Sequence, residues 1–90
     1  MYNIGMNIDD DGVKIIQVRI IELTNQRINL ESQLREVTHK IDIEDREFTK
    51  RELNRHRKNL IGKIIECEKI LFLNKQLLNQ TNEHEYQLEN

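Results

Sequence analysis

The sequence lacks proline, tryptophan and alanine, and it contains only three glycines and one cysteine. Because proline kinks or ends helices, its absence permits long uninterrupted ones. The single cysteine, Cys67, excludes an internal disulfide, and we expect a reducing, cytoplasmic location. No apolar run reaches the ~18 residues of a membrane span, and no signal peptide is expected.

An excess of charge of one sign is also missing. The 14 Lys and Arg residues nearly balance the 16 Asp and Glu residues, and the net charge is −2. This balance argues against a polyanion mimic and against a general attraction to nucleic acid, so any such contact must depend on a local patch. Ninety residues make at most one small domain. A compact core is marginal at this size, and a partner chain often completes it.

Apolar residues recur at alternating spacings of three and four, which is the heptad pattern of a helix seam. The pattern predicts two long helices, at about residues 11–42 and 50–80, that form an antiparallel coiled-coil hairpin. A polar C-terminal tail, residues 81–90, is expected to fray. The first seam comprises Val13, Ile16, Ile20, Leu23, Arg27, Leu30, Leu34, Val37 and Ile41, and the second comprises Leu53, Arg57, Leu60, Ile64, Cys67, Leu71, Asn74 and Leu78.

The join between the seams carries a helix-start signal. Thr49 and Glu52 fit a capping box, and Phe48 with Leu53 fits the accompanying hydrophobic staple. A turn centred near residue 47 pairs Leu34 with Leu60, Leu23 with Leu71 and Arg27 with Cys67. The segment has no glycine or proline to force the turn, so one continuous helix through residues 42–49 is the alternative.

The N-terminal segment, residues 1–10, allows two interpretations. Asp9 caps the first helix, with Ile8 and Val13 as its staple, or else residues 1–18 form a β-hairpin around the turn "DDDG". Because the seam already starts at Val13, we favour the helix.

Further apolar rows lie outside the seams, although a surface helix normally shows one apolar stripe. We therefore expect a protein interface and, most simply, a homodimer that forms a four-helix bundle. The alternative is that these rows bind a different protein. The predicted interface residues are Ile61, Ile65, Ile70, Phe72, Leu73 and Leu77 in the second helix, with Ile21 and Ile28 in the first.

Three seam positions carry polar residues: Arg27, Arg57 and Asn74. A polar residue in a seam can fix register and oligomeric state at some cost in stability, or its head can reach solvent at the seam edge. Near the end of the hairpin we favour the solvent-facing interpretation for Arg57, whereas for Arg27 both interpretations stay open.

No metal, cofactor or catalytic site is predicted. "NIDDDG" resembles the first half of a calcium loop, but the twelfth position, which needs Glu, is Val18. His39, His56, His84 and Cys67 show no metal-ligand spacing. At its seam position Cys67 is expected to act as a small buried apolar side chain. There is no phosphate loop or nucleophile motif, and an enzyme is not expected.

A basic run lies at the start of the second helix. A basic stretch followed by heptads resembles the layout of basic leucine zippers, but "NRHRKN" at 54–59 does not reproduce the residue pattern of their basic region. Arg51, Arg55 and Lys58 share the face opposite the seam and are the candidates for phosphate contact. A small nucleic-acid-binding regulator is therefore the alternative function, and a phage or mobile-element inhibitor or adaptor is a third.

Overall fold

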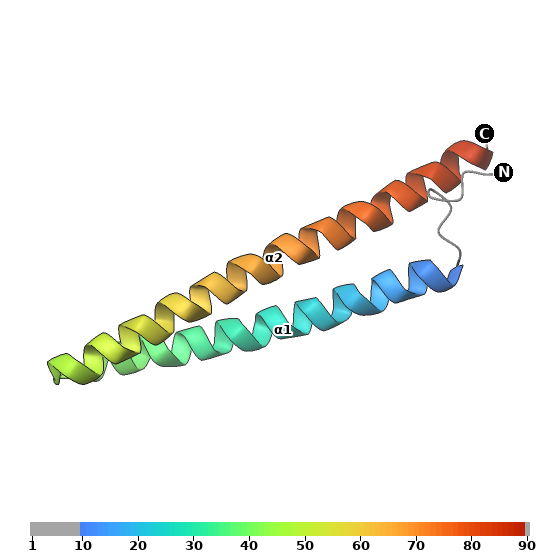
Figure 1. The fold of residues 1–90 in the computed structure, drawn as a ribbon. Coiled ribbons are helices and arrows are strands. Elements are labelled where there is room, and N and C mark those ends of the chain that lie inside the picture. The colour runs from blue at the N-terminus through green and yellow to red at the C-terminus, as the bar shows by residue number, and fades with distance from the viewer. Residues whose placement is uncertain (1–9, 90) are drawn as a thin grey trace.

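The computed structural model describes the backbone of residues 10–89 and the side chains of residues 11–80. Two helices, α1 (Asp10–Ile43) and α2 (Glu47–Glu89), pack against each other after a single reversal of the chain (Figure 1). Residues 10–89 contain no strand. The molecule is a rod with extents of 65 × 19 × 16 Å. The predicted all-α helical hairpin is confirmed.

The core is a single line of side chains between the two helices. Every buried apolar residue among the described side chains is a predicted seam residue, because only the three-four spacing keeps a side chain on the face that meets the other helix. Burying each such side chain stabilises the hairpin by roughly 1.5–3 kcal/mol. The buried set is Ile16, Leu23, Leu30, Val37, Leu60, Ile64, Cys67 and Leu71.

The turn occupies residues 44–46, so the alternative of one continuous helix through residues 42–49 is wrong. The Glu44 amide donates to the Ile41 carbonyl over 3.3 Å, which closes the end of α1. The Glu44 carboxylate then accepts from the Arg46 backbone amide and from the Arg46 Nε, each over 2.9 Å. A single acidic side chain therefore holds the backbone at the reversal without glycine or proline.

The start predicted for the second helix, at Thr49, is also wrong. The Arg46 carbonyl accepts from the Lys50 amide over 2.9 Å, so Arg46 is the N-cap and Thr49 already lies inside α2. Glu47 follows in the first turn, where the helix dipole favours an acidic residue. Phe48 is exposed rather than stapled. Thr49 does not cap the helix, because the Glu44–Arg46 contacts place the N-cap three residues earlier, at Arg46.

The outer ends of the helices settle two further predictions. Val13 to Val18 lie in α1, so the β-hairpin interpretation of residues 1–18 is wrong. The predicted cap at Asp9 lies outside the described residues. At the other end, α2 continues to Glu89 instead of ending near residue 80, and fraying of residues 81–90 stays a prediction.

Candidate protein interface

Large apolar side chains remain on the outside of the hairpin after its core is formed. Seven of the eight predicted interface residues are exposed; Ile70 is the exception, because it packs against the hairpin's own core. Four more exposed apolar residues were not predicted as interface: Ile15, Val18, Ile43 and Phe48. In the described part of the chain the exposed apolar residues are Ile15, Val18, Ile21, Ile28, Ile43, Phe48, Ile61, Ile65, Phe72, Leu73 and Leu77.

The predicted interface residues divide between two flanks of the hairpin. Successive residues of a helix point about 100° apart, so Phe72 and Leu73 lie on opposite sides of the α2 surface that faces away from α1. We call the first set, which draws on both helices, the Phe72 flank: Ile21, Ile28, Ile61, Ile65 and Phe72. The second set, which we call the Leu73 flank, comprises Leu73 and Leu77 with the half-buried Ile70.

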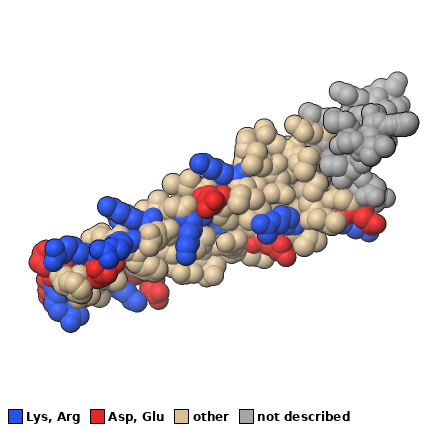
Figure 2. Space-filling model, in the orientation of Figure 1, with Lys and Arg blue, Asp and Glu red and all other residues tan. Residues whose placement is uncertain are grey.

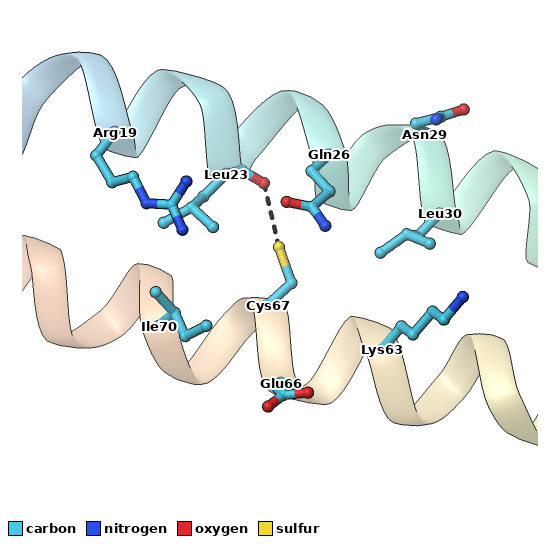
Figure 3. A pocket seen from close by; sticks show the side chains of 9 residues that line it. All are labelled: Arg19, Leu23, Gln26, Asn29, Leu30, Lys63, Glu66, Cys67 and Ile70. Atoms are coloured by element: carbon cyan, nitrogen blue, oxygen red, sulfur yellow. Dashed lines mark hydrogen bonds between the residues drawn. The ribbon is translucent and has the colours of Figure 1, made fainter.

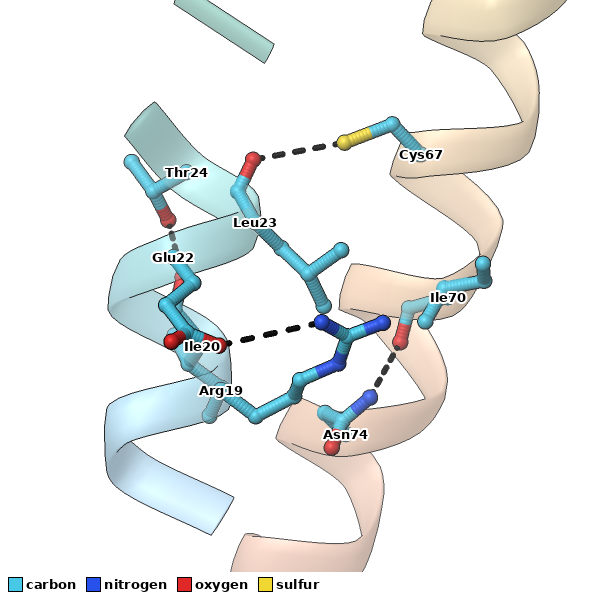
Figure 4. Close-up of polar contacts among 8 residues, drawn as sticks. All are labelled: Arg19, Ile20, Glu22, Leu23, Thr24, Cys67, Ile70 and Asn74. Atoms are coloured by element: carbon cyan, nitrogen blue, oxygen red, sulfur yellow. Dashed lines mark hydrogen bonds and ion pairs between the residues drawn. The ribbon is translucent and has the colours of Figure 1, made fainter. Parts of the chain in front are cut away.

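A cavity of about 450 Å³ shows what lies on the Leu73 flank (Figure 3). Its walls combine side chains at the edge of the core with polar ones, which include Gln26 and Asn29 from α1 and Lys63 and Glu66 from α2. The Arg19 side chain reaches from α1 toward Ile70 on α2 (Figures 3 and 4). In its central part, therefore, polar side chains border the core on the Leu73 flank, and the exposed leucines of this flank lie only toward the open end of the hairpin.

The Phe72 flank differs because the seam itself is partly open there. In α1, the row spaced every seven residues from Ile16 to Val37 is buried, whereas the neighbouring row through Ile20 and Leu34 is only half-buried. On a helix of 3.6 residues per turn, that half-buried row lies on the same side of α1 as Ile21 and Ile28. A polar row that includes Thr24, Glu31 and Thr38 runs between them, so this flank combines exposed apolar side chains of both helices with polar ones.

The three polar seam residues differ in burial and in hydrogen bonding. The Asn74 side-chain amide donates to the Ile70 carbonyl of its own helix over 2.8 Å (Figure 4). Arg57 is exposed, as the solvent-facing interpretation predicted. Arg27 is half-buried, and its Nε is fully buried without a hydrogen-bond partner among the described residues. A buried donor without a partner costs about 1–3 kcal/mol, so we expect Arg27 to destabilise the isolated hairpin.

The three predicted phosphate contacts lie together. Arg51, Arg55 and Lys58, with Asn54, line a shallow hollow of about 300 Å³ on α2, and all three cations are exposed. Arg55 also pairs with Glu52 over 3.3 Å. Figure 2 shows that charged side chains of both signs gather at the turn end, while much of the body on this face is uncharged. Acidic side chains nearby, including Glu52, therefore neutralise part of the positive charge of this basic patch.

The histidines and the motif that resembles half a calcium loop form no metal site among the described residues. Among the described residues, no three His, Cys, Asp or Glu side chains gather as a metal site, and His39 and His56 are exposed. The His84 side chain lies outside the described ones. Asp11 and Gly12 of the calcium-loop motif lie within α1, while Asn7 and Asp9 fall outside the described residues. No helix in the described range is long and apolar enough to cross a membrane.

The chain matches no protein-family model, no curated protein and no solved structure.

Proposed function

We propose that this protein is a non-enzymatic interaction or assembly module that acts through the apolar outer faces of a helical hairpin. The observation that carries the proposal is the apolar surface left exposed on both helices after the core has formed. Contiguous exposed apolar patches of a few hundred Å² mark sites of protein association. The described part of the chain has no second layer to cover them.

The simplest assembly is a homodimer in which two hairpins form a four-helix bundle. A two-helix rod buries only one face of each helix, whereas a four-helix bundle buries a wider stripe of each helix. The net charge of −2 gives little repulsion between copies. Self-association therefore has an apolar driving force and a small electrostatic cost.

The test is the molar mass of the purified protein by light scattering, from micromolar to submillimolar concentrations. The proposal expects either a dimer or, if the protein is a monomer, a stoichiometric protein partner that co-purifies from the native host. A monomer at every concentration that also co-purifies with no protein would overturn it.

The second candidate is a nucleic-acid contact at the basic hollow, which the grouping of Arg51, Arg55 and Lys58 around Asn54 favours. Phosphate contacts need only reachable positive charge, and their affinity falls steeply with salt. A salt-dependent gel shift with DNA or RNA that disappears in the triple Ala variant would support it. The control is a triple Ala variant of Arg19, Lys40 and Lys69, which are also exposed but lie elsewhere.

A further inference from the structure

We propose that the Phe72 flank is the surface on which a second copy of this chain docks, and that the Leu73 flank stays outside this interface. The inference rests on the proposed function and sharpens it. The sequence pattern alone did not divide the exposed apolar residues into these two flanks.

The solvent-exposed area of the rod is large enough for a second copy to dock. The chain exposes 7140 Å², whereas a compact monomer of its mass, 10.9 kDa, exposes about 5600 Å². The excess of about 1500 Å² exceeds the ~800 Å² per partner that a standard stable interface buries. The rod therefore exposes more than the area that one standard interface with a second hairpin requires.

Both helices supply exposed apolar residues to the Phe72 flank. An interface that completes a four-helix bundle must draw on both helices of each hairpin, at the edge of the existing core. The Phe72 flank meets this condition, because Ile21 and Ile28 come from α1, Ile65 and Phe72 come from α2, and the half-buried row through Ile20 lies between them. On the Leu73 flank, α1 contributes exposed apolar residues only near its two ends, Ile15 and Ile43, and polar side chains such as Gln26 and Asn29 lie between them.

The charged residues of the Phe72 flank also favour docking of a second copy. Arg27 lies in the half-open row with a buried, unpaired Nε, and Glu31 and Glu68 lie on the same flank. None of the three forms an ion pair within the described chain. When two copies meet on this flank, each Arg27 comes within the reach of carboxylates from the other copy. The same contact thus hides apolar surface and supplies Arg27 with acceptors.

The experiment compares two adjacent substitutions, Phe72→Glu and Leu73→Glu. Phe72 is 59% exposed and Leu73 is 61% exposed, so the isolated hairpin tolerates either change equally, yet they point to opposite flanks. Sedimentation equilibrium gives the dimer Kd of each variant, and circular dichroism checks that each stays helical.

We expect the wild type to be dimeric, Phe72→Glu to raise the dimer Kd at least about 100-fold because a charge is buried without a partner, and Leu73→Glu to change it less than about threefold. If Leu73→Glu dissociates the dimer and Phe72→Glu does not, the flank assignment is wrong while the assembly function stands. Equal effects of the two variants also overturn the assignment. A monomeric wild type overturns the second copy as occupant, and co-purification then decides the proposed function separately.

Discussion

The Cys67 Sγ donates to the Leu23 carbonyl oxygen across the helix interface, over 3.3 Å. In α1 that carbonyl points toward the amide of Arg27, one turn later. The contact therefore sets Cys67 beside the turn that runs from Leu23 to Arg27, in agreement with the register predicted from the two seams. It is a hydrogen bond between the helices at the middle of the core (Figure 4).

Because this thiol is buried, its reactivity reports opening of the hairpin. Cys67 is only 4% exposed, so a thiol reagent such as DTNB reaches it only after the helices separate. We expect labelling of the folded protein to be at least about 100-fold slower than in concentrated urea, as local opening of a core site requires. Labelling at the unfolded rate would show that the two helices are not packed around Cys67.

Leu60→Ala tests the core. Leu60 is 2% exposed and lies among the buried side chains of both helices, so truncation is expected to lower the free energy of unfolding by about 2–5 kcal/mol. Ile43→Ala, at a 65% exposed position near the turn, is the matched control and is expected to change it by less than about 1 kcal/mol. Urea unfolding at one fixed protein concentration measures both.

Arg27→Leu is expected to stabilise the isolated hairpin by about 1–2 kcal/mol, because it replaces a buried unpaired donor with an apolar side chain at a seam position. Thermal unfolding at low protein concentration measures this gain. If Arg27 also fixes the assembly, the variant populates more than one oligomeric state at high concentration.

Arg57→Leu is the control for that substitution, since Arg57 is also a seam residue but is exposed. Its expected effect on stability is within about 0.5 kcal/mol. Equal stabilisation by both leucines would mean that burial of Arg27 Nε has no energetic consequence.

The turn has a pH dependence. Hydrogen bonds from the Arg46 side chain and backbone lower the pKa of Glu44 below its ordinary value of 4.5. Because the pKa is lowered in the folded state, the contribution of this contact is present above that ordinary value and is lost as the pH falls through the lowered pKa. NMR titration of the Glu44 carboxyl is expected to show the pKa rising toward 4.5 in Arg46→Ala. An unchanged titration would rule out Arg46 as the cause.

Most of the fold was predictable because burial in a two-helix rod depends only on heptad spacing. Leu23, Leu30 and Leu60 were identified from the three-four pattern, and all three are buried. The helix start was not, because a capping box at Thr49 is a local preference worth about 1 kcal/mol. The contacts between Glu44 and Arg46 involve side-chain geometry that spacing does not describe.

The candidate interface was predictable as a set of residues but not as a surface. A helical wheel identifies Phe72 and Leu73 as exposed, yet it does not show what the other helix places beside each of them. The packed hairpin shows that Ile70 belongs to the core instead.

The three-residue connection at 44–46 also determines the order in which contacts can form. Near the turn, residues that pack together are separated by few chain positions, whereas Leu23 and Cys67 are separated by 44. Because the entropy lost in closing a loop grows with its length, pairing is cheapest next to the turn and propagates outward like a zipper. We therefore expect folding of this rod to start at its charged tip, and the open ends of α1 and α2 to be the last to join and the first to separate.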